Sequence, residues 1–218
     1  MPEEYSVDIY HHLRRARVQL DSGKHESLFY AAFELRCGVE ARLQEYLEAR
    51  DDIAKKKKKG WKVAAAGKEL DKAFKNGLRI VEIVIYSPAT GDSAPFFHTP
   101  VQPELRTAVG QLGDLLHAQA DTISGDSPWW AQTREFLEEV FVMAADLARG
   151  TLLAPVLQSP TGQMTLRAYY HKENPIGTVF QDMSPFSKGS QMQVKVDYHD
   201  DMPKRAIPYL NDWRPKDA

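Results

Sequence analysis

The chain has 218 residues, a formal net charge of -2 and 43% hydrophobic residues, which is typical of a globular protein with a sizeable core. A charge this close to zero gives no general attraction for nucleic acid or anionic lipid. The single cysteine, Cys37, excludes an intramolecular disulfide and a cysteine-based zinc cluster. The first residues are acidic, and no apolar stretch approaches the roughly 20 residues that a membrane helix needs, so we expect a cytoplasmic protein without membrane association.

Two helices are predicted at the start of the chain, over about 6–20 and 26–50, because apolar residues recur there at helical spacing. Ser6 is a suitable N-cap for the first helix. The second segment has a broad apolar face, which indicates a central helix of a bundle. That face contains Leu28, Ala32, Leu35, Val39, Leu43 and Tyr46.

Between residues 61 and 149 the sequence pattern predicts a helix, a strand, a loop and two further helices. A third helix is predicted over about 61–75, followed by a strand over 78–86, where the sequence LRIVEIVIY is rich in β-branched residues. Residues 87–100 contain turn-forming residues and are predicted to be a loop. Helices over about 103–120 and 128–149 follow, each with a proline that suits its first turn.

After residue 150 helical periodicity disappears, and alternating patterns over 164–170 and 192–198 predict two half-buried antiparallel strands. The sequence therefore predicts an α+β protein, mainly a helical bundle of about five helices with a small antiparallel β region. We expect the bundle over 1–150, including the strand near 78–86. The β region and an irregular tail occupy 151–218, and the early strand is a candidate to join that β region.

A lysine-rich segment is the first candidate functional feature. Residues 53–80 contain ten basic and two acidic residues, so this segment carries a charge of +8. A stripe of lysines suits the phosphate backbone of nucleic acid, and a tryptophan can stack on an unpaired base. The candidate nucleic-acid-binding residues are Lys55, Lys56, Lys57, Lys58, Lys59, Trp61, Lys62, Lys68, Lys72 and Lys75. The alternative, which stays open, is that these lysines form a solvated connector between helices.

The second candidate is an arginine on an apolar helix face. At 100° per residue, Arg36 falls beside Val39 and Leu43, and Glu40 follows one turn later. A charge in that position costs free energy unless it is paired and hydrogen-bonded. We therefore predict either a buried Arg36–Glu40 pair that fixes helix packing, or an arginine directed into a cleft where it holds a phosphate.

The second predicted helix, with the sequence SLFYAAFELRCGVEARLQEYLE, resembles the second helix of the HEPN superfamily. The shared features are an aromatic-alanine start and a Glu-x-Arg element, matched here by Glu34 and Arg36, and the resemblance covers about 6–76. It implies a helical bundle of the kind found in prokaryotic defence and toxin–antitoxin systems. Catalytic members cleave RNA without metal through an Arg-x4-6-His motif. No such motif occurs in this sequence, so the resemblance implies a scaffold or binder more readily than a ribonuclease.

Other polar clusters predict little chemistry. Three carboxylates and His199 follow one another in DYHDD, residues 197–201, but no second cluster at ligand spacing accompanies them. The adjacent His11 and His12 point about 100° apart on a helix, so they cannot easily share one metal ion, and we expect them at the surface. No glycine-rich phosphate loop, HExxH or dinucleotide fingerprint is present, and we expect neither a metal nor a cofactor.

Three functions are consistent with these features. The first is a non-catalytic binding or assembly subunit of a bacterial multi-component system for anti-phage defence, which contacts RNA or DNA through the lysine-rich segment. The second is a divergent metal-independent ribonuclease that uses Arg36 with a histidine brought in by folding or by a second subunit. The third is a structural homodimerisation module. Both the first and the third imply a protein partner or a homo-oligomer.

Overall fold

The computed structural model describes residues 6–51, 53–58, 63–74, 78–88, 91, 93–117, 122–155, 157–158, 164–165 and 193–203. These residues form two compact units. The helical unit contains the described residues of 1–73 and 101–148, and the β unit contains those of 74–100 and 149–212. Among the described residues, none of the helices combines the length and apolar character needed to cross a bilayer.

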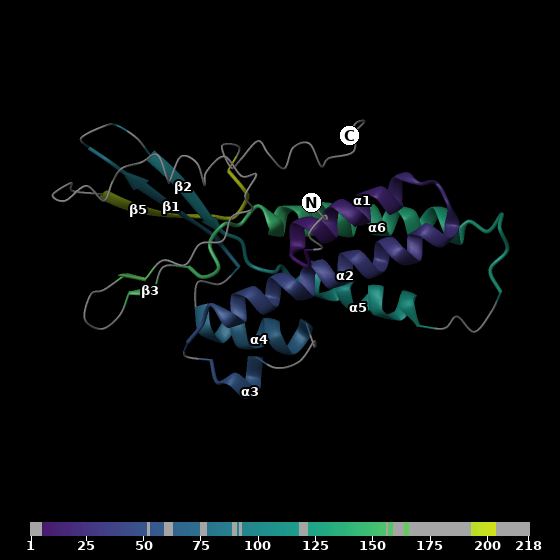
Figure 1. Cartoon of the computed structure of the whole chain (residues 1–218), viewed down its shortest axis with the longest axis horizontal. Helices are drawn as coiled ribbons and strands as arrows, with labels where there is room; N and C mark the ends of the chain where they lie inside the picture. Colours follow the sequence, from purple (N-terminus) through teal and green to yellow (C-terminus); the bar gives the residue numbers. More distant parts are fainter. Residues whose placement is uncertain are drawn as a thin grey trace, which may run out of the picture. The chain divides into compact units, whose positions relative to one another are not determined.

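The helical unit is built around α2 (His25–Glu48), which packs against α1 (Ile9–Asp21), α5 (Pro103–Leu116) and α6 (Trp129–Ala148) (Figure 1). Helix α6 also contacts α1. After α2, the chain forms the one-turn helix α3 (Lys55–Lys58) and then α4 (Val63–Phe74). The core between the long helices consists of aliphatic and aromatic side chains, among them Leu13, Leu20, Leu28, Leu35, Val39, Leu43, Leu105, Leu112, Leu137 and Phe141.

Helix α1 begins later than the sequence predicts, because Asp8 is its N-cap in place of Ser6. The Asp8 carboxylate accepts hydrogen bonds from the backbone N–H of His11 at 3.0 Å and from Oγ of Ser6 at 2.8 Å. Partial burial raises the pKa of Asp8, but the hydrogen bonds from His11 and Ser6 outweigh it and lower the pKa to about 2. The prediction that Ser6 caps this helix was therefore wrong. Asp8 is the N-cap, and Ser6 donates a hydrogen bond to its carboxylate.

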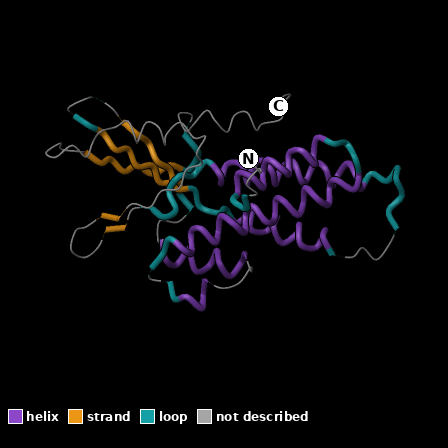
Figure 2. The backbone as a smooth tube through the Cα atoms, in the orientation of Figure 1, coloured by secondary structure: helices purple, strands orange, loops and turns teal. Residues whose placement is uncertain are grey.

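The β unit contains a three-stranded antiparallel sheet in the order β2-β1-β5, which Figure 2 shows as adjoining orange strands. Its strands are β1 (Ile80–Tyr86), β2 (Ser93–His98) and β5 (Gln193–His199). Strand β1 lies in the middle, so the early strand does join the late β region. A second pair, β3 (Leu157–Gln158) and β4 (Met164–Thr165), is also antiparallel.

Strand β2 corrects the prediction of a loop over 87–100. Pro95, which suggested a loop, lies within β2 opposite Val84 of β1. Proline lacks the N–H that a central strand needs, but it is tolerated in a strand that has a neighbour on one side only. Because β2 is at the edge of the described sheet, Pro95 is compatible with strand structure there.

The two faces of the sheet differ in composition. One face carries an apolar cluster of Val81, Ile83, Ala94 and Phe96, which Leu152 covers. The other face contains a smaller apolar cluster and, on the central strand, the fully buried Glu82. Val81 and Ile83 flank Glu82 in the sequence of β1. Because successive residues of a strand point to opposite faces, the side chain of Glu82 lies on the face opposite their cluster.

The predicted fold class, an α+β protein that is mainly helical, is confirmed. The described part of the chain has five helices of at least 12 residues and the one-turn α3. The strand expected near 78–86 belongs to the β unit, so the division of the chain differs from a simple boundary at residue 150. Most of the strand predicted over 164–170, and the tail after 203, lie outside the described residues.

Candidate functional site

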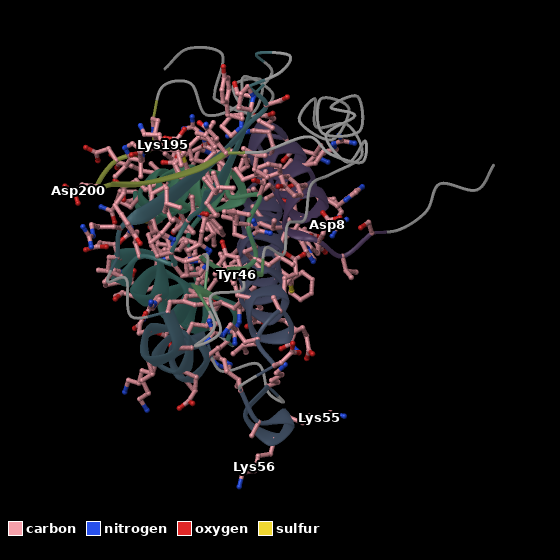
Figure 3. The ribbon with its side chains drawn as sticks, turned by 90° about the vertical axis from the view of Figure 1, so that its left-hand side faces the viewer. Asp8, Tyr46, Lys55, Lys56, Lys195 and Asp200 are labelled. Carbon is pink, nitrogen blue, oxygen red and sulfur yellow. The ribbon has the colours of Figure 1, made fainter. Side chains whose placement is uncertain are left out.

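The described lysines of α3 fall into two groups. Lys55 and Lys56 are exposed, and Figure 3 shows their side chains pointing away from the rest of the helical unit. The side chain of Lys58 is only 10% exposed, and its Nζ lies 3.4 Å from the carbonyl oxygen of Glu48. Glu48 is the last residue of α2, where the helix dipole is negative, so Lys58 stabilises the end of α2. Lys58 therefore has a structural partner, whereas Lys55 and Lys56 face solvent.

Helix α4 carries the other described lysines. Lys68 is exposed, and Nζ of Lys72 lies 3.4 Å from the carboxylate of Glu69. The other acidic residue of this helix, Asp71, accepts two hydrogen bonds from Arg106, at 2.6 and 2.7 Å. Both carboxylates of α4 are thus engaged by cations. Within the described part of the chain, Lys55, Lys56 and Lys68 have no ion-pair partner.

Arg106 attaches α4 to α5. Besides its bidentate pair with Asp71, it donates through Nε to the carbonyl oxygen of Val101 at 2.8 Å. Its guanidinium lies against Gly67, where a Cβ atom would come within 2.9 Å of the guanidinium carbon. Arg50, at 5% exposure, donates to the carbonyl oxygen of Ala73 from beyond the end of α2. Helix α4, which carries Lys68 and Lys72, is therefore held to α5 by Arg106 and to the segment after α2 by Arg50.

The remaining residues of the lysine-rich segment lie outside the described part. These are Lys59, Trp61, Lys62 and Lys75, together with the side chain of Lys57. The geometry of the segment therefore rests on Lys55, Lys56, Lys58, Lys68 and Lys72.

Arg36 lies at the margin of the core, between α2 and α5. Its Nε is 2.9 Å from Oε1 of Glu40, and the two side chains are 25% and 23% exposed. A Cβ atom at Gly113 of α5 would lie 2.6 Å from Nη1 of Arg36, so the glycine provides the space for the guanidinium. The pair is therefore a half-buried contact between neighbouring turns of α2, placed where α5 passes over it.

The fully buried arginine of α2 is Arg42, which the sequence analysis missed. Its Nη1 donates to Oε2 of Glu45 at 2.8 Å, and its guanidinium lies 4.9 Å from the ring centre of Tyr46. Burial lowers the pKa of Arg42, but the nearby Tyr46, Tyr10 and Glu45 more than offset this and raise it. Burial also raises the pKa of Tyr10 to about 12, so its phenol is neutral at pH 7 beside the Arg42 guanidinium.

A second polar cluster that the sequence analysis missed joins α1 to α2. His12 was expected at the surface but is 7% exposed. Its Nδ1 lies 2.7 Å from Oε2 of Glu34, and Nε of Arg15 donates to the same oxygen at 2.9 Å. The helices approach closely here, because a Cβ atom at Gly38 would lie 3.0 Å from that of His12. The two members of the Glu-x-Arg element therefore have different partners, with Glu34 facing α1 and Arg36 paired with Glu40.

The acidic run at 197–201 is divided between separate contacts. His199 lies 2.8 Å from the carboxylate of Glu82, through Nε2, and Asp197 lies 2.8 Å from Nζ of Lys195. Among the described residues, no three side chains of His, Cys, Asp or Glu are placed to hold a metal ion together. Asp197 and His199 of this run therefore make polar contacts within the sheet.

No protein-family model matches the chain, and no curated protein or solved structure shows significant similarity to it. The resemblance of α2 to HEPN helices therefore remains a hypothesis that rests on the sequence of that helix alone.

Proposed function

We propose that the protein is a non-catalytic binding subunit that contacts the phosphate backbone of RNA or DNA through the exposed lysines of α3 and α4. The observation that supports this proposal is the set formed by Lys55, Lys56 and Lys68. These side chains are exposed and have no ion-pair partner among the described residues, whereas the carboxylates of α4 are already engaged by other cations. Their charge is therefore available to phosphates, each of which releases a counterion when it is neutralised.

The attachment of α4 supports the same proposal. Because Arg106 ties α4 to α5, Lys68 is presented from a fixed helix, and fewer conformations are lost when it binds. The total charge is -2, so the chain as a whole adds no general attraction for nucleic acid to that of the +8 segment. We accordingly expect weak binding that depends strongly on salt.

Fluorescence anisotropy with labelled single-stranded RNA, single-stranded DNA and duplex DNA tests the proposal. We expect the logarithm of affinity to fall linearly with the logarithm of salt concentration. Each phosphate contact that is removed lowers the slope by roughly 0.7 to 0.9. The variant Lys55→Ser/Lys56→Ser should therefore lower the slope by about 1.5, and adding Lys68→Ser should lower it further. The melting temperature should stay the same, since exposed lysines contribute little to folding.

Lys24→Ser is the matched control. Lys24 is an exposed lysine at the N-cap of α2, and the 24 residues of that helix separate it from α3 by roughly 36 Å. It should leave both affinity and slope unchanged. The proposal fails if none of the three nucleic acids binds at about 50 mM salt, or if the control and the double variant weaken binding equally.

The wider role is an inference from the HEPN resemblance. It suggests assembly with a protein partner or a second copy in a bacterial defence system. The single cysteine favours the cytoplasm as the compartment. Isolation of the native complex, followed by identification of what co-elutes, tests this part separately from the binding of nucleic acid.

A metal-independent ribonuclease is the second candidate function, and the cluster of His12, Arg15 and Glu34 favours it. An imidazole held by a carboxylate next to a guanidinium is a combination that acid–base cleavage of a phosphodiester can use. Exposure of only 7% at His12 limits access of a substrate, which is why we prefer the binding function. Cleavage of labelled RNA in the presence of EDTA that is lost in His12→Ala would favour the enzyme.

A further inference from the structure

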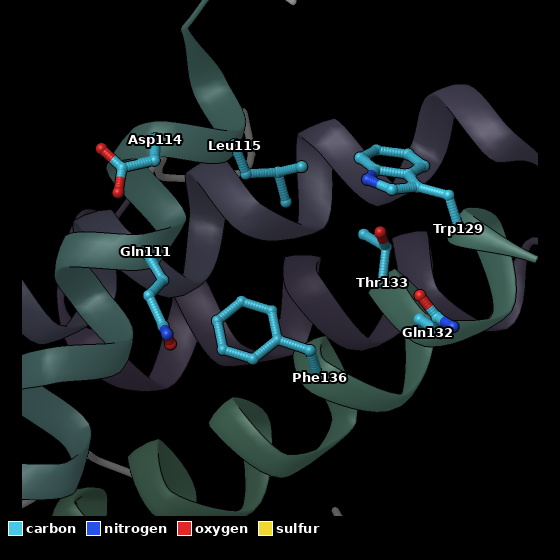
Figure 4. A pocket seen from close by; sticks show the side chains of 7 residues that line it. All are labelled: Gln111, Asp114, Leu115, Trp129, Gln132, Thr133 and Phe136. Atoms are coloured by element: carbon cyan, nitrogen blue, oxygen red, sulfur yellow. The ribbon is translucent and has the colours of Figure 1, made fainter. Parts of the chain in front are cut away.

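A groove between α5 and α6 is separate from the lysine-rich segment. Its cavity volume is about 420 Å³, within the range of roughly 300–1,000 Å³ that small-molecule sites occupy. It lies within the helical unit, and Figure 4 shows side chains from both helices around it. The main lining residues are Gln111, Asp114 and Leu115 of α5 and Trp129, Thr133 and Phe136 of α6.

Two aromatic rings flank the groove on the α6 side. Trp129 and Phe136 are seven residues apart, so they lie on the same side of the helix, about two turns or 10 Å from each other. The indole of Trp129 packs against Trp130, at 4.8 Å between ring centres, and near Phe29 of α2, at 6.2 Å. Trp129 therefore offers a flat apolar surface in a fixed orientation.

Polar groups of the groove have unused hydrogen-bonding capacity. Thr133 is 8% exposed and lies between Trp129 and Phe136 in Figure 4, and its hydroxyl has no hydrogen-bond partner among the described residues. The side chains of Gln111 and Asp114 on α5 likewise make no hydrogen bond within the described part of the chain. These three groups border the groove and are not engaged by the described residues, so a ligand with N–H donors can bond to them in place of water.

We propose that this groove binds a small planar aromatic or heteroaromatic molecule that carries N–H donors, of the size of one nucleobase. The rings of Trp129 and Phe136 favour a flat π system. The amide oxygen of Gln111, the hydroxyl of Thr133 and the carboxylate of Asp114 are acceptors that match N–H groups. The same carboxylate disfavours anionic ligands. This site does not depend on the proposed binding of a phosphate backbone.

Ligand-observed NMR on the full chain tests the site with adenine, benzamidine and benzoate as probes. Adenine is neutral with N–H donors, benzamidine is a planar cation with N–H donors, and benzoate is a planar anion without them. We expect adenine and benzamidine to bind with Kd values of about 1 mM or below and benzoate to bind at least about tenfold more weakly. Equal binding of all three probes, or no binding of adenine and benzamidine, would overturn the proposal.

Two variants locate the binding. Phe136→Ala removes one aromatic wall and should weaken both ligands about tenfold. Thr133→Val keeps the shape of the side chain and removes the hydroxyl, so it should weaken both ligands by about threefold to tenfold with little change in melting temperature. Val142→Ala, at an exposed position later on α6, is the control and should have no effect on binding. Binding that is the same in Phe136→Ala and Thr133→Val as in the unaltered protein would place it elsewhere and overturn the proposal.

Discussion

The helical unit and the β unit each contain a charged side chain with no exposed surface, and they provide its partners in different ways. Arg42 of α2 pairs with Glu45 and lies against Tyr46, three and four residues later in the same helix. Glu82 of β1 pairs with His199 of β5, which is 117 residues away in the sequence. Glu45 and Tyr46 are next to Arg42 as soon as α2 forms, whereas Glu82 acquires His199 only when β5 joins the sheet.

This difference shows what a buried charge requires in each context. A helix places residues three and four apart side by side, so it can satisfy a charge locally. A strand alternates its side chains between two faces, so a buried carboxylate on the central strand depends on neighbouring strands. The following five predictions test whether local and distant partners differ in this way, beginning with the largest expected effect.

Replacement of Arg42 should destabilise the protein most. Arg42→Ala removes a buried cation and leaves a void beside Tyr10 and Tyr46, so we expect a loss of about 3–5 kcal/mol in the free energy of unfolding. Urea unfolding followed by circular dichroism measures the loss. Arg14→Ala, at an exposed position on α1, should change stability by no more than about 0.5 kcal/mol. Similar losses in both variants would show that the burial of Arg42 carries no special cost.

The charge of Asp8 is a second case of local pairing, and it predicts a pH dependence. The folded-state pKa is about 2 and the ordinary value is 3.8, so the carboxylate stabilises the folded state above pH 3.8. That contribution is lost as the pH falls toward 2, and it amounts to about 2 kcal/mol. Asp8→Asn can still cap α1 but has no charge. The difference in stability between the two proteins should be present at pH 5 and vanish near pH 2, and a constant difference would exclude this origin.

Removal of the distant partner of Glu82 should have a moderate effect. His199→Ala takes one hydrogen bond from the buried carboxylate, which costs about 1–2 kcal/mol. Hydrogen exchange of the β1 amides should become faster while that of α2 changes little. Lys195→Ala, with an exposed side chain on the same strand, is the control. If exchange in α2 increased as much as in β1, the two units would not respond separately.

The pair of Arg36 and Glu40 should contribute little. Both side chains are about a quarter exposed and lie on successive turns of one helix, so we expect Arg36→Ala to cost about 0.3–0.5 kcal/mol. Glu40→Ala should cost the same, and the double variant should cost no more than either alone. A loss above about 2 kcal/mol for Arg36→Ala would mean that the pair behaves as a buried one, like Arg42.

The smallest effect concerns the reactivity of Cys37. Burial raises the pKa of this half-buried thiol, so less of it is thiolate at pH 8 than in an unfolded chain. Alkylation should therefore be about tenfold slower in the native protein than in denaturant, and it should accelerate as the pH rises. Equal rates in the two states would show that neither burial nor nearby carboxylates protect the sulfur.

The sequence predicts the long helices well because each carries its own apolar periodicity, but it cannot distinguish Arg36 from Arg42. The two arginines are about 120° apart on the helical wheel and border the same apolar face on opposite sides. Only the packing of neighbouring helices makes one fully buried and leaves the other a quarter exposed. Periodicity within α2 contains no information about which neighbour covers which border.

The other contacts that the sequence analysis missed also depend on how separate elements pack together. The lysine run could be found by counting charges, but the contact of Lys58 with the end of α2 depends on α3 turning back toward that helix. The pairing of His12 with Glu34 depends on the crossing of α1 and α2 at Gly38. Strand β2 was missed because Pro95 disfavours strand structure unless the strand is at an edge, and edge position is a property of the whole sheet.

The strand order β2-β1-β5 has a consequence for the timing of folding during synthesis. Strands β1 and β2 are close in sequence and can pair early, and the last helix of the bundle ends at residue 148. One side of β1 must then wait for residues 193–199 before its N–H and C=O groups find partners. The exposed segment would be IVEIVIY, whose β-branched residues make an unpaired edge prone to associate with other chains. We therefore expect the ribosome-bound chain to carry a folded helical unit and an aggregation-prone β1 until β5 emerges.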